Sequence, residues 1–269
     1  MKVINIEKII TKIRYGIFIP RKITRKPGQK NSVISDLFPV RTNYEWTTFF
    51  ESINVPGLIN GDNSETAQSE AIFIFFDNHG RNIGNVVSKV GLTSRQTVKL
   101  DKVFFPEIEN ASTFAVFHQN FKLNSALNGS YLAERGYVGL QKNSLNCRGY
   151  VHGNLDAIAY AEGKIELLGN SGILPRVYQV QHPLRGEAKY EFILTNPTSR
   201  VQTVYFQYKS KSNFWETIQK IQLQSRGSHI FNIDLKDTEV GLVRFKSHLY
   251  LARPVVIRHE RDAFDIFHG

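Results

Sequence analysis

The stretch VQTVYFQY at residues 201–208 indicates the fold class, because its apolar and polar residues alternate. In an extended strand, Val204, Phe206 and Tyr208 fall on one side and the intervening residues on the other. Similar short runs rich in Val, Ile, Phe and Tyr follow one another from residue 71 onward, separated by clusters of Gly, Asn, Ser and Asp. The pattern predicts a mainly β protein built of antiparallel sheets, each with one buried face and one solvated face.

Two halves of this β region resemble each other at a fixed offset, which predicts a duplication. A period this long indicates two full tandem domains, and we expect β-sandwich-like domains at residues 42–170 and 171–269, behind an N-terminal segment at 1–41. Three matched pairs lie 119 residues apart, and a fourth lies 116 apart: 73–74 with 192–193, 77–81 with 196–200, 131–133 with 250–252, and 151–153 with 267–269.

The second half contains the turn sequences Asn-Pro-Thr at 196–198, after a strand, and Gly-Ser at 227–228, before another. This arrangement over residues 188–259 resembles the immunoglobulin- or fibronectin-III-like β-sandwich modules of bacterial proteins. The resemblance implies a sandwich fold and a binding or scaffolding role, and it carries over no catalytic residues. The first half has Asp-Asn-His-Gly at 77–80 in place of the proline turn, so the likeness is weaker there.

The positive charge is concentrated at the N-terminus. The chain has 269 residues and a formal net charge of +10, and residues 1–41 hold ten basic and two acidic residues. Residues 3–19, VINIEKIITKIRYGIFI, place isoleucines at helical spacing, which predicts a basic amphipathic helix. We expect seven cations of this segment to contact a membrane surface or an acidic partner: Lys8, Lys12, Arg14, Arg21, Lys22, Arg25 and Lys26.

Three interpretations of this segment stay open. The helix packs on the body of the protein, or it docks on an anionic membrane surface, or it binds an acidic protein partner. Nucleic acid is disfavoured as a partner, because the cations are not interleaved with stacking aromatic residues. The segment lacks the features of a secretory signal, and no long uncharged apolar stretch is present, so we expect a cytoplasmic protein held at the inner membrane face.

Residues 43–54 predict a short aromatic helix. Trp46, Phe49, Phe50 and Ile53 have helical spacing, and Thr42 with Glu45 fits a capping box. The aromatic stripe fits a buried core better than a ligand groove. Two tryptophans are nevertheless candidates for stacking on a ligand such as a sugar ring, Trp46 and Trp215.

The sequence shows no familiar catalytic motif, and its one cysteine, Cys147, excludes an internal disulfide framework. No local histidine pair has metal-ligand spacing, so we predict neither a metal nor a cofactor. The duplication gives His152 and His268 equivalent places, with Asp156 and Asp265 near them in sequence. An imidazole beside a carboxylate suits acid–base chemistry, although structural histidines at strand ends are the simpler interpretation.

The leading hypothesis is a non-catalytic binding or scaffolding protein, peripheral at an anionic membrane surface and linked to cell-envelope glycans. One alternative is an enzyme whose site, built from those histidines and aspartates, forms between the two β domains. The other is a structural subunit of a larger assembly, joined through exposed strand edges. The sequence does not fix the oligomeric state.

Overall fold

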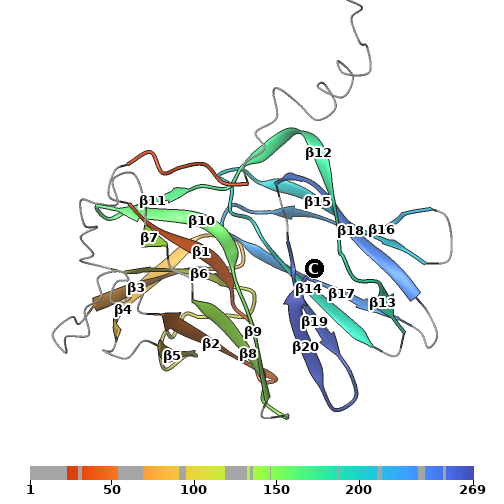
Figure 1. Cartoon of the computed structure of the whole chain (residues 1–269), viewed down its shortest axis with the longest axis horizontal. Helices are drawn as coiled ribbons and strands as arrows, with labels where there is room; N and C mark the ends of the chain where they lie inside the picture. The colour runs from red at the N-terminus through yellow and green to blue at the C-terminus, as the bar shows by residue number, and fades with distance from the viewer. Residues whose placement is uncertain are drawn as a thin grey trace, which may run out of the picture.

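The structure is a computed structural model that describes residues 23–29, 32–53, 69–90, 95–118, 132–133, 136–145, 147–186, 188–210, 214–235, 240–250 and 253–269 (Figure 1). This described part is mainly β and contains no helix, which confirms the predicted fold class at that level. A helix able to span a membrane is accordingly not found among these residues. The basic helix predicted at residues 3–19 lies outside the described residues.

The first eleven strands form two sheets. One has the order β11-β10-β1-β6-β3-β4, with β7 pairing in parallel beside β1; the other has the order β5-β2-β8-β9. The first sheet consists of β1 (Val33–Pro39), β3 (Ser69–Phe76), β4 (Asn82–Val90), β6 (Thr113–His118), β7 (Leu132–Ala133), β10 (Asn154–Ala161) and β11 (Lys164–Leu167). The second consists of β2 (Trp46–Ile53), β5 (Arg95–Leu100), β8 (Tyr137–Lys142) and β9 (Cys147–Val151).

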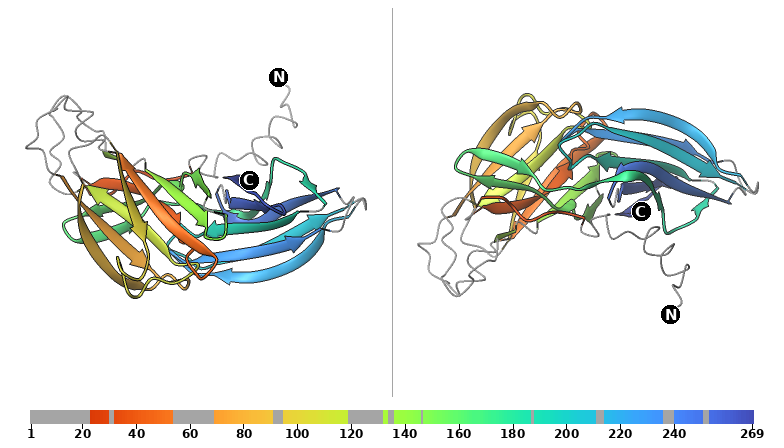
Figure 2. Two further views of the ribbon diagram at one scale, coloured as in Figure 1. Left: turned by 90° about the horizontal axis from the view of Figure 1, so that it is seen from below. Right: turned by 90° about the horizontal axis from the view of Figure 1, so that it is seen from above.

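The last nine strands form two further antiparallel sheets, which lie beside the first two in the views of Figure 2. We call the sheet β12-β18-β15-β16, with β13 alongside β18, the outer sheet, and the sheet β17-β14-β19-β20 the central sheet. The outer sheet consists of β12 (Ser171–Gln179), β13 (Leu184–Arg185), β15 (Gln202–Lys209), β16 (Glu216–Leu223) and β18 (Val240–Leu249). The central sheet consists of β14 (Lys189–Thr195), β17 (Ser228–Asp234), β19 (Val255–His259) and β20 (Phe264–His268).

Strand β14 of the central sheet is buried on both faces. On β14, Phe192 and Leu194 pack into a core shared with the outer sheet, where they meet Phe206 and Phe245. Ile193, on the other face of β14, belongs instead to the core of the first half. A strand buried on both sides reads as a continuous apolar run rather than an alternating one, as KYEFILT does. The two halves therefore share a hydrophobic core through the central sheet.

The segment predicted as an aromatic helix is strand β2, so that prediction was wrong. β2 pairs with β5 on one side and β8 on the other, and its inward-facing Trp46, Thr48 and Phe50 are buried. The opposite face carries Phe49, which packs under the guanidinium of Arg148 with 3.4 Å between that group and the ring centroid. Aromatic and β-branched residues favour strands. Backbone pairing with β5 and β8 stabilises the extended conformation of this segment, although its apolar residues also have helical spacing.

Two turns also join the halves. In the turn after β3, Gly80 has a φ of 77°, and a Cβ there would lie 1.7 Å from the carbonyl oxygen of Ser225 in the turn before β17. Any side chain at Gly80 would collide with that backbone. Beside it, the Thr113 hydroxyl donates to the Arg226 carbonyl at 2.6 Å, and the Arg226 guanidinium lies over the Phe76 ring. These contacts fix one half against the other at their edges.

The first matched pair, residues 73–74 and 192–193, lies on central strands in both halves. Phe73 on β3 and Phe192 on β14 are both fully buried, and each strand has a partner on either side. The chain then leaves these strands differently. The turn at 77–81 returns it into the same sheet as β4, whereas the turn at 196–200 carries it across to β15 in the outer sheet.

Candidate functional site

The structure brings together the two histidines singled out from the sequence. His152 directly follows β9, His268 ends β20, and these two strands pack against each other. Burial lowers the pKa of His268 to about 4, with the positive charge of Arg253 and the nearby His152 as further causes. The His152 ring lies against Tyr137, with 4.2 Å between ring centroids. Both histidines are thus packed into the contact between the halves.

The two candidate aspartates have structural partners of their own. Asp156 lies on β10 with a φ of 49°, and its backbone N–H donates to Asp36 Oδ1 at 2.8 Å. Asp265 on β20 forms an ion pair with Arg258 of β19 at the surface, where both line an open pocket of about 320 Å³. Because side chains alternate along a strand, Asp265 and His268 point to opposite faces of β20. Asp265 therefore does not join the histidine pair.

Within the described ranges, no group of three or more His, Cys, Asp or Glu side chains is placed to hold a metal ion.

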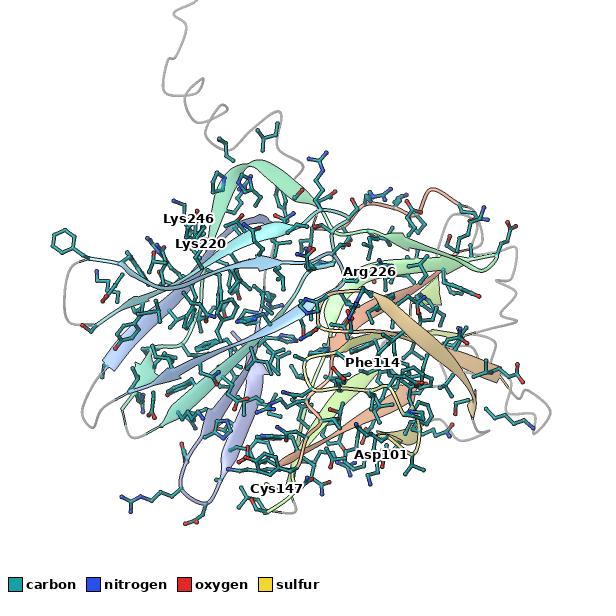
Figure 3. All side chains as sticks on the ribbon, turned by 180° about the vertical axis from the view of Figure 1, so that it is seen from behind. Asp101, Phe114, Cys147, Lys220, Arg226 and Lys246 are labelled. Atoms are coloured by element: carbon teal, nitrogen blue, oxygen red, sulfur yellow. The ribbon has the colours of Figure 1, made fainter. Side chains whose placement is uncertain are left out.

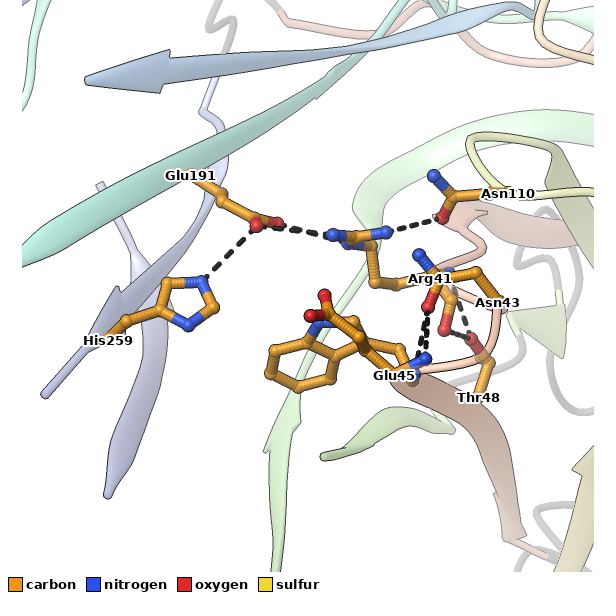
Figure 4. Close-up of polar contacts among 8 residues, drawn as sticks. Arg41, Asn43, Glu45, Thr48, Asn110, Glu191 and His259 are labelled. Atoms are coloured by element: carbon orange, nitrogen blue, oxygen red, sulfur yellow. Dashed lines mark hydrogen bonds and ion pairs between the residues drawn. The ribbon is translucent and has the colours of Figure 1, made fainter. Parts of the chain in front are cut away.

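A buried ionic network that the sequence reasoning missed lies where the halves meet (Figure 4). Arg41, just after β1, donates from Nε and Nη2 to the two carboxylate oxygens of Glu191 on β14, at 3.0 and 3.1 Å. Its Nη1 donates to Asn110 Oδ1 at 2.9 Å, and His259 Nε2 lies 3.3 Å from Glu191 Oε1. Arg41 and Glu191 are both buried. This bidentate pair fixes the orientation of the central sheet against the first half.

The network holds Glu191 in its ionised form. Burial by itself would raise the pKa of Glu191, but the contacts with His259 and Arg41 outweigh it and lower the pKa to about 2. The sequence did contain a signal, because Glu191 interrupts the apolar strand KYEFILT. A charged residue in such a run requires a buried partner. That the partner is Arg41, 150 residues away, is visible only in the fold.

Trp46 belongs to this junction and not to a ligand surface. Its side chain is 1% exposed, and its ring packs edge-on against His259 and Phe264 at centroid distances of 5.7 and 5.0 Å. The suggestion that it stacks on a ligand is therefore corrected, because its ring is covered by the second half.

Trp215, the other candidate, lies on the open side of the outer sheet. The Arg244 guanidinium stands 4.2 Å from the centroid of its ring, and Arg244 Nε donates to Gln207 Oε1 at 2.8 Å. Lys220 lies on β16, and its Nζ is 5.4 Å from the centroid of the Tyr205 ring on the adjacent strand β15. Each of the two aromatic rings is thus held beside a cation.

These residues form one surface, which we call the cationic aromatic face: Tyr205, Gln207, Trp215, Lys220, Arg244 and Lys246. Pairing across β18, β15 and β16 places Lys246, Tyr205 and Lys220 in one row, with Arg244 and Gln207 in the next. Figure 3 labels Lys220 and Lys246 on this sheet. Adjacent strands lie about 4.8 Å apart, so the two lysine-bearing strands are ~10 Å apart with the Tyr205 ring between them.

Charge is segregated by the fold. The five strands of the outer sheet hold one acidic residue, Glu216, and six basic residues: Arg176, Arg185, Lys209, Lys220, Arg244 and Lys246. The four strands of the central sheet hold three acidic residues, Glu191, Asp234 and Asp265, and two basic residues, Lys189 and Arg258. A body that is nearly neutral along the sequence therefore presents one strongly basic sheet.

Of the basic N-terminal residues, only Arg25 and Lys26 are described. The Arg25 guanidinium pairs with the Glu166 carboxylate and donates to the Leu167 carbonyl, so it is bound to the body of the protein. Lys26 is exposed. The other five candidates, Lys8, Lys12, Arg14, Arg21 and Lys22, lie outside the described residues.

No family model, curated protein or solved structure matches this chain.

Proposed function

We propose that this chain is a non-catalytic binding protein that holds an acidic glycan on its cationic aromatic face. The observation that carries the proposal is the composition of the outer sheet, which combines six basic residues with one acidic residue. Two aromatic rings lie among the cations of the open side, Tyr205 and Trp215.

Each component of this face has a counterpart in an acidic sugar chain. The ammonium groups of Lys220 and Lys246 pair with carboxylate, sulfate or phosphate groups. The aromatic rings hold Arg244 and Lys220 in place beside the bound sugar. The amide of Gln207, fixed by Arg244 and by Thr217 at 3.0 Å, offers hydrogen bonds to hydroxyl groups.

The face suits a sugar better than a nucleic-acid base. Arg244 lies over the Trp215 ring, and Lys220 lies over the Tyr205 ring. A flat base would have to displace these cations in order to stack on the covered faces, as single-stranded nucleic acids do on open aromatic platforms. A hydroxylated ring can instead hydrogen-bond beside them.

The same proposal includes the architecture, the origin and the location of the protein. Each half is a β-sandwich-like domain, the two arose by duplication with a boundary near residue 171, and the protein is peripheral at an anionic membrane surface, on its cytoplasmic side. The shared core on each side of the central sheet supports the sandwich description.

The test is calorimetric titration of the full chain with an acidic oligosaccharide, such as oligogalacturonate, and with a neutral oligosaccharide of equal length. Variants Trp215→Ala and Lys220→Ala/Lys246→Ala should each weaken binding of the acidic ligand about tenfold, which corresponds to ~1.4 kcal/mol. The matched control is Lys164→Ala, which removes an exposed lysine of β11 in the other half. It should bind like the parent.

Three results would contradict the proposal. These are equal affinity for the acidic and neutral sugars, unchanged binding by both variants, and tighter binding of a single-stranded oligonucleotide than of the acidic glycan.

A further inference from the structure

Strand β12 carries a protruding apolar bulge at residues 172–175, which we call the β12 bulge. Ser171 pairs with Leu249 and Arg176 with Ser247, so four residues of β12 stand opposite a single residue of β18. The surplus is pushed out of the sheet. Ile173 is 82% exposed, Leu174 is 61% exposed, and the next residue, Pro175, is also exposed.

The base of the bulge is held firmly on both sides. His248 Nδ1 lies 2.9 Å from the Gly172 carbonyl oxygen, and the backbone N–H of Tyr250 donates to the Asn170 carbonyl at 3.1 Å. At the other end, Arg176 Nη2 donates to the Tyr250 hydroxyl at 3.0 Å. The apolar tip therefore projects from an anchored base, and an apolar group that is ordered in solution loses little entropy when it enters a partner.

The N-terminal segment joins the body beside this bulge. The Asn170 N–H donates to the Ile23 carbonyl at 2.9 Å, and the Arg25 N–H donates to the Leu168 carbonyl at 2.9 Å. Thr24 bridges to Gly169. The 22 residues that precede Ile23 contain the isoleucine stripe and five of the candidate cations. A basic, apolar-striped segment thus leaves the described structure within a few residues of Ile173.

We propose that the β12 bulge inserts into the interfacial region of an anionic lipid bilayer. Ile173 and Leu174 enter the boundary between headgroups and acyl chains, where exposed apolar side chains are stabilised. The cations of the outer sheet are attracted to the negatively charged headgroups. The inference rests on the membrane part of the proposed function and names the surface that enters the lipid. It is independent of glycan binding, because it uses a different surface and a different ligand.

Charge favours a membrane over the alternative in which residues 1–22 fold back and cover the bulge. The bulge belongs to the outer sheet, whose strands hold six basic residues and one acidic residue. A basic segment packed against that sheet would meet charge of its own sign, which is unfavourable. An anionic bilayer attracts both the segment and the sheet.

The first test is flotation of the full chain with vesicles of phosphatidylcholine alone or with added phosphatidylserine, at low and high salt. We expect salt-sensitive binding to the anionic vesicles. The double variant Ile173→Ser/Leu174→Ser should lower the partition coefficient about tenfold or more, since it removes two inserting side chains. The control is Val103→Ser, which replaces a side chain that is 93% exposed on the β5–β6 connection.

A fluorescent reporter tests insertion directly. Ile173→Trp should shift its emission to the blue on addition of anionic vesicles, as a ring does when it leaves water. Val103→Trp should not shift. Both variants keep Trp46 and Trp215, so the comparison cancels their contribution.

Four outcomes would overturn the proposal. They are absence of flotation, flotation of the double variant equal to that of the parent, a blue-shifted Ile173→Trp spectrum before vesicles are added, and loss of flotation in Lys220→Ala/Lys246→Ala but not in the bulge variant. The third would show that the chain itself covers the bulge, and the fourth that the cationic aromatic face binds the lipid. The vesicles contain no glycan and the sugar titrations contain no lipid, so either proposal can fail alone.

Discussion

The central and outer sheets share one hydrophobic core but use their second faces in opposite ways. On β14 of the central sheet, every residue from Tyr190 to Thr195 is buried, whereas on β15 of the outer sheet the buried residues Val204 and Phe206 alternate with half-exposed ones. The second face of the central sheet joins the two halves. The second face of the outer sheet is open and basic. The difference teaches that buried contacts are concentrated in one sheet and exposed cations on the other.

The largest expected effect is the loss of a central-sheet ring. Phe192→Ala empties a fully buried site on β14 between Phe206 and Phe245, and it should lower the free energy of unfolding by about 4 kcal/mol. The matched control is Phe214→Ala, the same change at a ring that is 81% exposed, which should alter it by less than about 0.5 kcal/mol. Urea denaturation measures both, and equal losses would contradict the division of roles between the sheets.

The next effect concerns the ion pair that orients the central sheet. Glu191→Gln should cost about 3 kcal/mol at neutral pH, because the buried Arg41 would keep its charge without its anionic partner. Glu166→Gln, at the more exposed pair with Arg25, should cost less than about 1 kcal/mol. Chemical denaturation of the two variants gives the comparison, and a Glu166 loss as large as that at Glu191 would argue against a special role of the junction.

The pH dependence of the same pair has a definite sign. Because the pKa of Glu191 falls from 4.5 to about 2 in the folded protein, the ionised carboxylate stabilises the fold above pH 4.5. This contribution, about 3 kcal/mol in size, is lost as the pH falls from 4.5 through 2. Thermal unfolding across that window should show a steeper decline for the parent than for Glu191→Gln.

A smaller effect on stability is expected at His268, on the edge strand β20 of the central sheet. Burial lowers the pKa of His268 from 6.5 to about 4, so the unfolded chain takes up a proton before the folded protein does. The free energy of unfolding should therefore fall as the pH drops from 6.5 to 4. The expected loss is about 2 kcal/mol, which is less than the full pKa shift would give, because the ring keeps some contact with solvent. His268→Gln should flatten the decline in this window.

The control is a histidine that does not lie in the junction. His79→Gln removes an exposed imidazole at the tip of the turn after β3, and it should change the free energy of unfolding by less than about 0.5 kcal/mol. A slope that survives in the His268 variant would place the titrating group elsewhere.

The smallest expected effect on stability is at the outer sheet. Lys220→Ala and Lys246→Ala remove exposed side chains from the cationic aromatic face, and each should change the free energy of unfolding by less than about 0.5 kcal/mol. Together with the binding measurements, this result would separate a surface that recognises a ligand from one that supports the fold. Losses above 1 kcal/mol would show that the lysines have a structural role instead.

The sequence predicted the β class because alternation is a local property. The residues of an alternating strand indicate which of its sides is buried, as Val204 and Phe206 do on β15. The same local reasoning failed at Trp46, where residues with helical spacing form a strand. There the decision came from β5 and β8, whose backbones pair with β2 on both sides and lie far from it along the chain.

The two proposed binding surfaces are visible only in the fold. Along the sequence, basic and acidic residues of the β region are intermixed. The net charge of that region is therefore small and does not reveal that one sheet is basic. Strand order brings Lys220 and Lys246 to either side of Tyr205, and strand pairing forces out the β12 bulge. Of the residues on the cationic aromatic face, the sequence singled out only Trp215 as a candidate for binding.

The sequence by itself determined the β class and which sides of the alternating strands are buried, because hydrophobic periodicity acts within a few residues. Tertiary structure alone decided which charges meet. Arg41 and Glu191 form a buried pair because the central sheet docks on the first half, and the cations of the outer sheet gather because pairing places distant strands side by side. Electrostatic interactions depend on distance in space, and separation along the chain does not reveal it.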